Sequence, residues 1–161
     1  MTDVRTFRSS PTEHLTTCRP VAGVAELTAH HRIRRAVFVT EQHLFSGTDD
    51  DGHDDEPATV HVLGLVDGEP AGTVRLYPLA GALWHGDRLA VLPEFRHSRI
   101  GAQLVRLAVT LAGERGGTRM RARVQLANVH FFEYLGWTST APPEDHLGVP
   151  HQWMAIPLGR T

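Results

Sequence analysis

Hydrophobic and polar positions change their spacing several times along this chain, and the changes divide it into short elements. Met120, Ala122 and Val124 alternate with arginines, which is typical of a strand with one buried face. Six stretches are expected to form strands, at 15–19, 60–64, 72–78, 82–92, 119–125 and 152–156. The turn residues at 67–70 favour antiparallel pairing of the second and third of these strands.

Longer spacing predicts helices in three stretches, at 22–42, 100–115 and 128–135. The second is the clearest, because Leu104, Ala108 and Leu111 fall on one face and Gly116 can end the helix. The first carries only a rough apolar stripe and is expected to end near Gln42. Together, the elements indicate one α+β domain without internal repeats.

Polar stretches separate these elements. Residues 1–12 are expected to be a loose lead-in, and Pro142-Pro143 marks a loop. The stretch 46–57 holds six acidic residues between Asp49 and Glu56 and ends in Pro57, so it predicts a loop rather than a packed element.

Composition narrows the function. The chain has 161 residues, which suits a single domain over 1–161, and a net charge of −2. All 16 basic residues are arginine, so chemistry that needs a lysine, such as a Schiff base, is excluded. The near-neutral charge argues against a nucleic-acid partner, and Cys18 alone cannot form an intrachain disulfide. No run of apolar residues is long enough to span a membrane. We therefore expect a cytoplasmic protein without a membrane partner.

The stretch DRLAVLPEFRHSRIGAQLV at 87–105 carries the most specific chemistry. A strand runs into an arginine-bearing loop, and Gly101 and Ala102 then open a helix. The first turn of a helix has backbone N–H groups without intrahelical partners and a partial positive charge, so it can bind a phosphate. Arg96 and Arg99 add positive charge, and Gly101 allows the ligand close to the backbone.

This stretch resembles the GNAT family of acetyl-CoA-dependent N-acetyltransferases, whose pyrophosphate loop follows an L-A-V-x-P strand. Arg99 departs from the pattern, since it stands where the family usually has a glycine. A second match is VQLANVHFFEYLGW at 124–137, where Gln125 takes the place of an asparagine that contacts the coenzyme and Asn128 the place of an alanine. Among members, the chain looks most like the nitrogen-starvation N-acetyltransferase group.

The resemblance implies a mixed, mostly antiparallel sheet of six to seven strands, flanked by about four helices and splayed between strands four and five. It implies acetyl-CoA as co-substrate, with its pantetheine arm pairing with the backbone of 89–91 as an added strand. The implied coenzyme-binding residues are Leu89, Ala90, Val91, Arg96, His97, Ser98, Arg99, Ile100, Gly101, Ala102, Gln125, Asn128, Phe131 and Phe132.

For catalysis, the resemblance places His85 where the family often has a glutamate base, and a neutral imidazole can do that work. Strand alternation puts His85, Asp87 and Leu89 on one face, so Asp87 could orient His85 or replace it; a solvent-facing His85 without a role is the alternative. The family's usual tyrosine acid aligns with Phe132, and Tyr134 is expected to be a packing residue.

The N-terminal half also resembles that of acyl-homoserine lactone synthases, in an Arg-x-x-x-Phe motif, an Asp-x-x-Asp loop and a later Arg-Leu. These carboxylates could attract a cationic amine, fixed by an arginine from the next strand, or could form a structural salt bridge in a solvated loop. The candidate acceptor-binding residues are Arg34, Phe38, Glu41, Asp51, Asp54 and Arg75.

No metal is expected. Aligning Gly52 with the sixth position of a calcium loop puts Gly47 and Ala58, which cannot ligate, at its ends, and nothing in the sequence groups His30, His31 and His151. The sequence thus predicts an acetyl-CoA-dependent N-acetyltransferase that acts on a small amine by direct attack in a ternary complex. It leaves open whether the protein forms a homodimer. The alternatives are an acyl-homoserine-lactone-type acyltransferase with a longer acyl donor and a non-catalytic acyl-CoA sensor.

Overall fold

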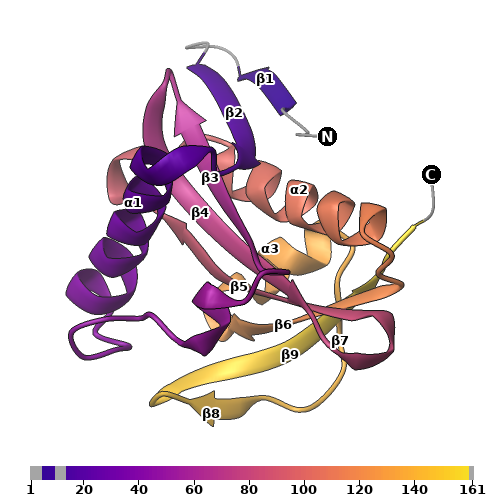
Figure 1. Ribbon diagram of the computed structural model, residues 1–161. Coiled ribbons are helices and arrows are strands. Elements are labelled where there is room, and N and C mark those ends of the chain that lie inside the picture. The colour runs from indigo at the N-terminus through magenta and orange to yellow at the C-terminus, as the bar shows by residue number, and fades with distance from the viewer. Residues whose placement is uncertain (1–4, 10–13, 160–161) are drawn as a thin grey trace.

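The computed structural model describes residues 5–9 and 14–159, which form one twisted sheet with helices on both faces (Figure 1). The strands are β1 (Arg5–Ser9), β2 (His14–Pro20), β3 (Val60–Val66), β4 (Glu69–Pro78), β5 (Leu83–Val91), β6 (Arg119–Gln125), β7 (Thr138–Ser139), β8 (Glu144–His146) and β9 (Val149–Pro157). The helices are α1 (Gly23–Arg34), α2 (Ile100–Glu114) and α3 (Val129–Tyr134), with a π-helical segment at Arg35–Glu41.

The sheet has the order β1-β2-β3-β4-β5-β6-β9-β7, and β8 pairs with β9. Every pairing is antiparallel except that of β5 with β6. The predicted mixed, mostly antiparallel α+β fold is therefore confirmed. The described residues form nine strands instead of six to seven because β1, β7 and β8 are short and carry little hydrophobic patterning.

Two predictions for the N-terminal part need correction. Residues 5–9 pair with β2, so a loose lead-in is wrong there; the rest of 1–12 lies outside the described residues. The helix predicted at 22–42 has the right extent, but its second half is wound as a π-helix in which the Gln42 N–H donates to the Val37 carbonyl. Such segments are frequent near functional sites.

The two faces of the sheet bury separate cores. Val62, Val74 and Leu76 point to the face covered by α2, whereas Leu63 and Leu65 point to the face covered by α1, as strand alternation requires. The larger core lies under α2 and includes its residues Ile100, Leu104, Leu107, Ala108 and Leu111. The predicted apolar face of 100–115 is therefore the buried one.

The parallel pair β5–β6 is joined over only part of its length. Backbone pairing begins at Leu83 with Arg119 and stops at Gly86 with Ala122, leaving 87–91 and 123–125 apart. The predicted splay between strands four and five is thus present. It lies between β5 and β6 in the numbering used here, because β1 precedes the strands counted in the prediction. Side chains and backbone groups from both strands face the resulting opening.

An extra residue breaks the alternation of β5. Arg88 has a left-handed φ of +55°, and the register against β4 slips by one residue there, which makes a β-bulge. The predicted common face therefore holds for His85 and Asp87 but is wrong for Leu89, which packs against the larger core on the opposite face.

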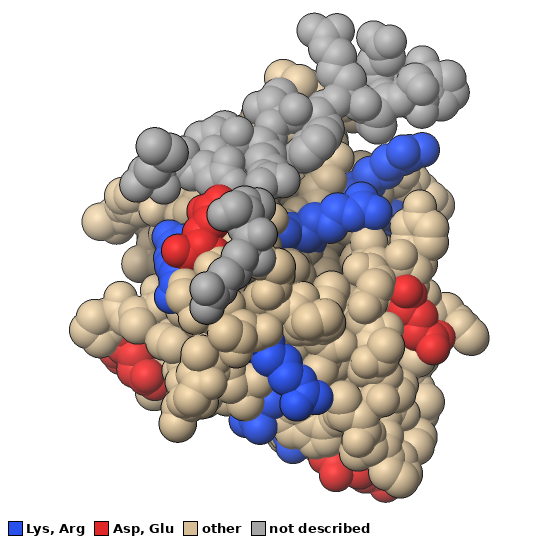
Figure 2. All heavy atoms as spheres, turned by 90° about the vertical axis from the view of Figure 1, so that its right-hand side faces the viewer, with Lys and Arg blue, Asp and Glu red and all other residues tan. Residues whose placement is uncertain are grey.

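The surface carries mixed charge. Figure 2 shows basic and acidic side chains in small separate groups among uncharged residues on the described part of that face. Among the described residues, no helix is long and apolar enough to cross a membrane.

Candidate active site

A groove of about 910 Å³ lies at the N-terminus of α2, beside the splayed end of β5. Most residues implied for coenzyme binding line it: Leu89, Ala90, Val91, Arg96, Ser98, Arg99, Gly101, Ala102, Gln125, Asn128 and Phe131. His97 does not line it, the Ile100 side chain is fully buried in the core, and Phe132 faces a second cavity. The structure therefore brings together two motifs that lie about 30 residues apart, as expected for helices that flank one strand pair.

The start of α2 can hold an anion. Its N-cap residue, Arg99, makes no side-chain capping hydrogen bond. The Ile100 N–H donates to Ser98 Oγ at 3.4 Å, and the N–H groups of Gly101 and Ala102 stay available to a ligand. A Cβ on Gly101 would lie 3.6 Å from Val91 Cγ2 and 3.8 Å from Phe131 Cζ, so the glycine lies close to the groove wall.

Arg96 is held in place by an ion pair across the mouth of this groove. Its Nη1 and Nη2 donate to the Glu41 carboxylate at 2.6 and 2.5 Å, and its Nε donates to the Val91 carbonyl at 3.0 Å. This pairing raises the pKa of Arg96 and lowers that of Glu41. Glu41, a candidate acceptor residue, thus lies beside this groove, which we call the coenzyme groove after the residues implied for it, and does not line the second cavity described below. Next to it, Gln125 Nε2 donates to Gln42 Oε1 at 3.0 Å.

A second cavity of about 390 Å³ adjoins the groove at the splay. Leu89, Gln125 and Asn128 line both, so the two spaces meet between β5 and β6. Of the candidate acceptor and catalytic residues, Phe38, Asp51, His85 and Asp87 line this cavity; Arg34, Asp54 and Arg75 do not.

His85 lines the second cavity but not the groove, and one of its ring nitrogens faces Asp87. Its Nε2 is 3.5 Å from Asp87 Oδ2, and its ring contacts Tyr77 at a centroid distance of 5.1 Å. His85 Nδ1 is buried and has no hydrogen-bond partner among the described residues. A carboxylate beside Nε2 favours the tautomer with its proton there, which leaves Nδ1 as the proton acceptor. Burial also raises the pKa of Tyr77, to about 12.

Asp87 is fixed by the fully buried Arg75. Arg75 donates to Asp87 at 2.8 and 2.7 Å and to Asp51 at 2.6 and 3.0 Å. Burial alone would raise the pKa of Asp87, but these hydrogen bonds from Arg75 hold it far below its ordinary value. Asp87 is therefore an anion, and its Oδ2 lies 3.5 Å from His85 Nε2.

The stretch 46–57, which we call the acidic loop, is a mostly exposed loop, as predicted, and ion pairs to buried arginines tie it to α1 and to the sheet, as the structural salt-bridge alternative expects. Arg34, fully buried, donates to Asp49 at 2.7 Å and to Asp54 at 2.7 and 3.1 Å, and Arg88 also donates to Asp49, at 2.9 Å. Asp51 caps a 3₁₀ turn at Gly52–Asp55. Burial opposes ionisation of Asp54, yet the bonds from Arg34 keep its pKa well below the ordinary value. We call Arg34, Arg75, Arg88 and Asp49, Asp51, Asp54 and Asp87 the arginine–aspartate network.

Three histidines gather behind this network, although nothing in the sequence groups them. His30 and His61 rings lie 4.9 Å apart, and His31 lies 5.6 Å from His61. Burial, and then Arg34, lowers the pKa of His30 to about 3, and burial also lowers that of His61. Both rings are therefore neutral at physiological pH.

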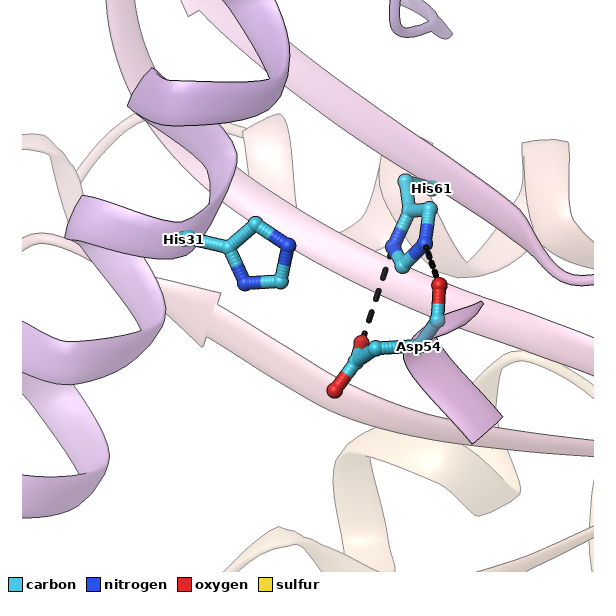
Figure 3. Close-up of side chains that lie close together, drawn as sticks. All are labelled: His31, Asp54 and His61. Atoms are coloured by element: carbon cyan, nitrogen blue, oxygen red, sulfur yellow. Dashed lines mark hydrogen bonds and ion pairs between the residues drawn. The ribbon is translucent and has the colours of Figure 1, made fainter. Parts of the chain in front are cut away.

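Figure 3 shows that His31, Asp54 and His61 point toward a common space. Two imidazoles and a carboxylate are ligands that Zn²⁺ accepts. However, Asp54 Oδ1 is already bound by Arg34 at 2.7 Å and lies 3.2 Å from Arg75 Nη1. Two guanidinium cations at the same oxygen oppose a metal ion, so we assign these residues to holding the loop against α1.

Two of the aromatic residues of α3, Phe132 and Tyr134, have different surroundings. Phe132 is buried among core residues, with its ring 5.3 Å from that of Trp137. Tyr134, expected to pack, is 79% exposed and lines the coenzyme groove. The sequence reasoning also missed Arg88, Arg123, His146 and His151, which line the second cavity. The alternation of 119–125 placed Arg123 on a strand face, which is the signal that was available for it.

Comparison with known proteins bears on this geometry. Residues 26–137 match the sequence model of the acetyltransferase (GNAT) family. The uncharacterized protein YyaT of Bacillus subtilis (strain 168) is 26% identical over 138 residues, covering 85% of this chain and 93% of YyaT.

Solved structures share the fold. The crystal structure of a candidate N-acetyltransferase from Lactobacillus plantarum aligns with a TM-score of 0.78 and 27% identity, over 89% of this chain and 98% of that one. A structure of BjaI, a CoA-dependent acyl-homoserine lactone synthase, with SAM and isopentyl-CoA aligns with a TM-score of 0.70 and 20% identity, over 83% and 76% of the two chains.

Proposed function

The chain belongs to the acetyltransferase (GNAT) family and is an acyltransferase, and on that premise we propose that it transfers an acetyl group from acetyl-CoA to a small-molecule amine by direct attack in a ternary complex. One observation carries the proposal. The coenzyme groove and the second cavity meet at Leu89, in the opening between β5 and β6. A thioester arriving along one and an amine arriving along the other come together there.

The donor side rests on the start of α2. The diphosphate of the coenzyme lies against the N–H groups near Gly101, and Arg99 supplies positive charge; Arg96 also lines the groove, with its charge offset by Glu41. The pantetheine arm then runs along 89–91, whose edge toward β6 is unpaired, and adds to β5 as a strand would. Binding of isopentyl-CoA by BjaI supports a CoA-derived donor.

The reaction follows from the contacts of His85. The amine nitrogen attacks the thioester carbonyl carbon, and the carbonyl oxygen takes the developing charge beside the backbone N–H of Leu89 or Ala90. His85 Nδ1 accepts the amine proton while Asp87 stabilises the imidazolium at Nε2. The C–S bond then breaks and the coenzyme leaves as a thiolate, which a thiol with a pKa of roughly 8.5 can do with little help from an acid.

A second candidate function is an acyl-CoA sensor. Phe132 stands where the family usually has its tyrosine acid, and the exposed Tyr134 lies on the coenzyme side. A sensor would bind the donor without transferring the acyl group. Both candidates predict binding, so only turnover distinguishes them.

Thiol release separates these candidates. The protein is incubated with acetyl-CoA and a panel of small primary amines, and free thiol is followed together with the mass of the acylated product. We expect amine-dependent release. Melting-temperature shifts with CoA, acetyl-CoA and longer acyl-CoAs run in parallel. A shift without thiol release from any amine would identify a sensor, and a shift that grows with chain length would identify a long-acyl donor.

A further inference from the structure

Beside His85, Arg123 lines the second cavity, and Arg121 and Trp153 lie next to it on β6 and β9, with the Trp153 ring 6.1 Å from that of His85. Arg121 is the register partner of His85 on β6, and Arg123 pairs with Trp153 on β9. Both arginines lie over the Trp153 ring, with their guanidinium carbons 4.9 and 4.4 Å from its centroid. A guanidinium held against a ring keeps its N–H edge free, in the plane that binds a carboxylate.

His85, Arg121 and Arg123 hold polar atoms that the protein leaves unpaired. Six buried side-chain nitrogen or oxygen atoms among the described residues lack a hydrogen-bond partner, and three of them are Arg121 Nε, Arg123 Nε and His85 Nδ1. Buried polar atoms without partners are rare in folded proteins because each has given up its hydrogen bonds to water without replacing them. Two of the three atoms belong to His85 and Arg123, which line the cavity, and the third belongs to Arg121, the register partner of His85, so a ligand in the cavity can supply the missing partners.

Charge changes sign across the cavity. On the β4 side, the arginine–aspartate network contains more carboxylates than guanidiniums, and its members Asp51, Asp87 and Arg88 line the cavity. On the β6 side, Arg121 has no carboxylate partner among the described residues, and Arg123 meets the exposed Glu144 at 3.4 Å. An acceptor with a cationic and an anionic group would match both sides.

We propose that the acceptor of this enzyme is an amino acid-like molecule, whose carboxylate binds Arg123 and Arg121 while its amine lies at His85. This inference rests on the proposed function and names the chemical class of its acceptor. His146, neutral because burial and then Arg123 lower its pKa, accepts from Arg123 Nη1 at 2.8 Å and so leaves the Nε of Arg123 for the ligand.

Acceptor pairs test the inference on the unmodified protein. Phenylalanine is compared with phenylalaninamide, and methionine with methioninamide, using acetyl-CoA and thiol release. The amides lose their ammonium proton more readily, so intrinsic reactivity favours them. We expect kcat/KM to be about tenfold or more higher for the amino acids, as charged hydrogen bonds to a guanidinium predict.

Other outcomes contradict the inference in distinguishable ways. Equal or better use of the amides would overturn it while leaving the acetyltransferase intact. Preference for phosphoethanolamine over both amino acids would overturn the choice of a carboxylate. An absence of transfer to any amine would instead be a failure of the proposed function.

Variants locate the binding groups. Arg123→Gln and Arg121→Gln should each lower kcat/KM for the amino acids about tenfold and leave the amides unchanged. The matched control is Arg119→Gln, an exposed arginine on the same strand, which should change neither. Glu144→Gln removes the competing carboxylate and should raise kcat/KM for the amino acids. The acetyl-CoA melting shift verifies folding of each variant, and equal losses for acids and amides would refute the assignment.

Discussion

Gly101 is the residue at which a single change tests the coenzyme site most directly. Gly101→Glu would place a carboxylate at the start of α2, where the diphosphate is expected, and repulsion should abolish the melting-temperature shift with CoA. Gly101→Ala is the control, because its Cβ would meet neighbours at 3.6 and 3.8 Å, ordinary contact distances. Unchanged CoA binding by Gly101→Glu would show that the diphosphate lies elsewhere.

The proposed role of His85 as general base predicts how turnover depends on pH. A general base must be unprotonated to accept the amine proton, so kcat/KM of the wild type should contain a component that rises with pH. In His85→Ala that component should disappear, leaving only the titration of the acceptor amine. The fully exposed His130→Ala serves as control. Profiles that coincide for wild type and His85→Ala would clear His85 of this role.

Single residues were predictable where a local motif governs them. The strand-loop-helix motif that contains Val91 and Gly101 places both at the groove, because short-range geometry fixes such a turn. The surroundings of Asp54 and Glu41 were not predictable, since their partners Arg34 and Arg96 are chosen by packing between distant segments. Leu89 was assigned to the wrong face because the bulge at Arg88 depends on register with β4.

At the scale of elements, the acidic loop acts as a clamp on the sheet. Asp54→Asn would remove one of the negative charges that balance the fully buried Arg34, and breaking a buried ion pair costs about 3 kcal/mol of folding stability. We expect a markedly lower urea midpoint. The control is Asp55→Asn, on the exposed neighbour. A midpoint unaffected by Asp54→Asn would mean that the loop contributes nothing to stability.

Elements with strong periodicity were predicted well, and short ones were not. Residues 100–115 and 119–125 became α2 and β6 because their apolar positions repeat at 3.6 and 2 residues. β7 and β8 have two and three residues, too few for a period to register. The π-helical turn at 35–41 could not be predicted, because its apolar content does not differ from that of an α-helix.

At the scale of the whole molecule, stability should depend on pH through the network. Asp51, Asp54 and Asp87 have folded-state pKa values below their ordinary ones, because hydrogen bonds from arginine outweigh burial. The unfolded chain binds protons first as pH falls. Their contribution is therefore complete well above about pH 4 and is lost progressively below it. Urea midpoints measured between about pH 7 and pH 3 should fall steeply at the acid end, and a flat profile would contradict this.

The global arrangement was largely predictable, since element order and the two motifs together select one topology. What the sequence did not reveal is the electrostatic design of the interior. Sequence analysis places charged residues at the surface, because burying a single arginine without a partner is energetically costly. Only the mutual approach of several distant segments makes Arg34 and Arg75 favourable inside the protein.

The incomplete pairing of β5 with β6 makes the molecule one continuous sheet at one end and two at the other. Amide groups along 87–91 and 123–125 then lack a neighbouring strand on that side, and their protons should exchange quickly with deuterated solvent. A pantetheine arm bound there would form backbone hydrogen bonds with 87–91 in place of the missing strand. Hydrogen–deuterium exchange should therefore slow at 87–91 when CoA is added, and exchange unaltered by CoA would mean that the arm follows another path.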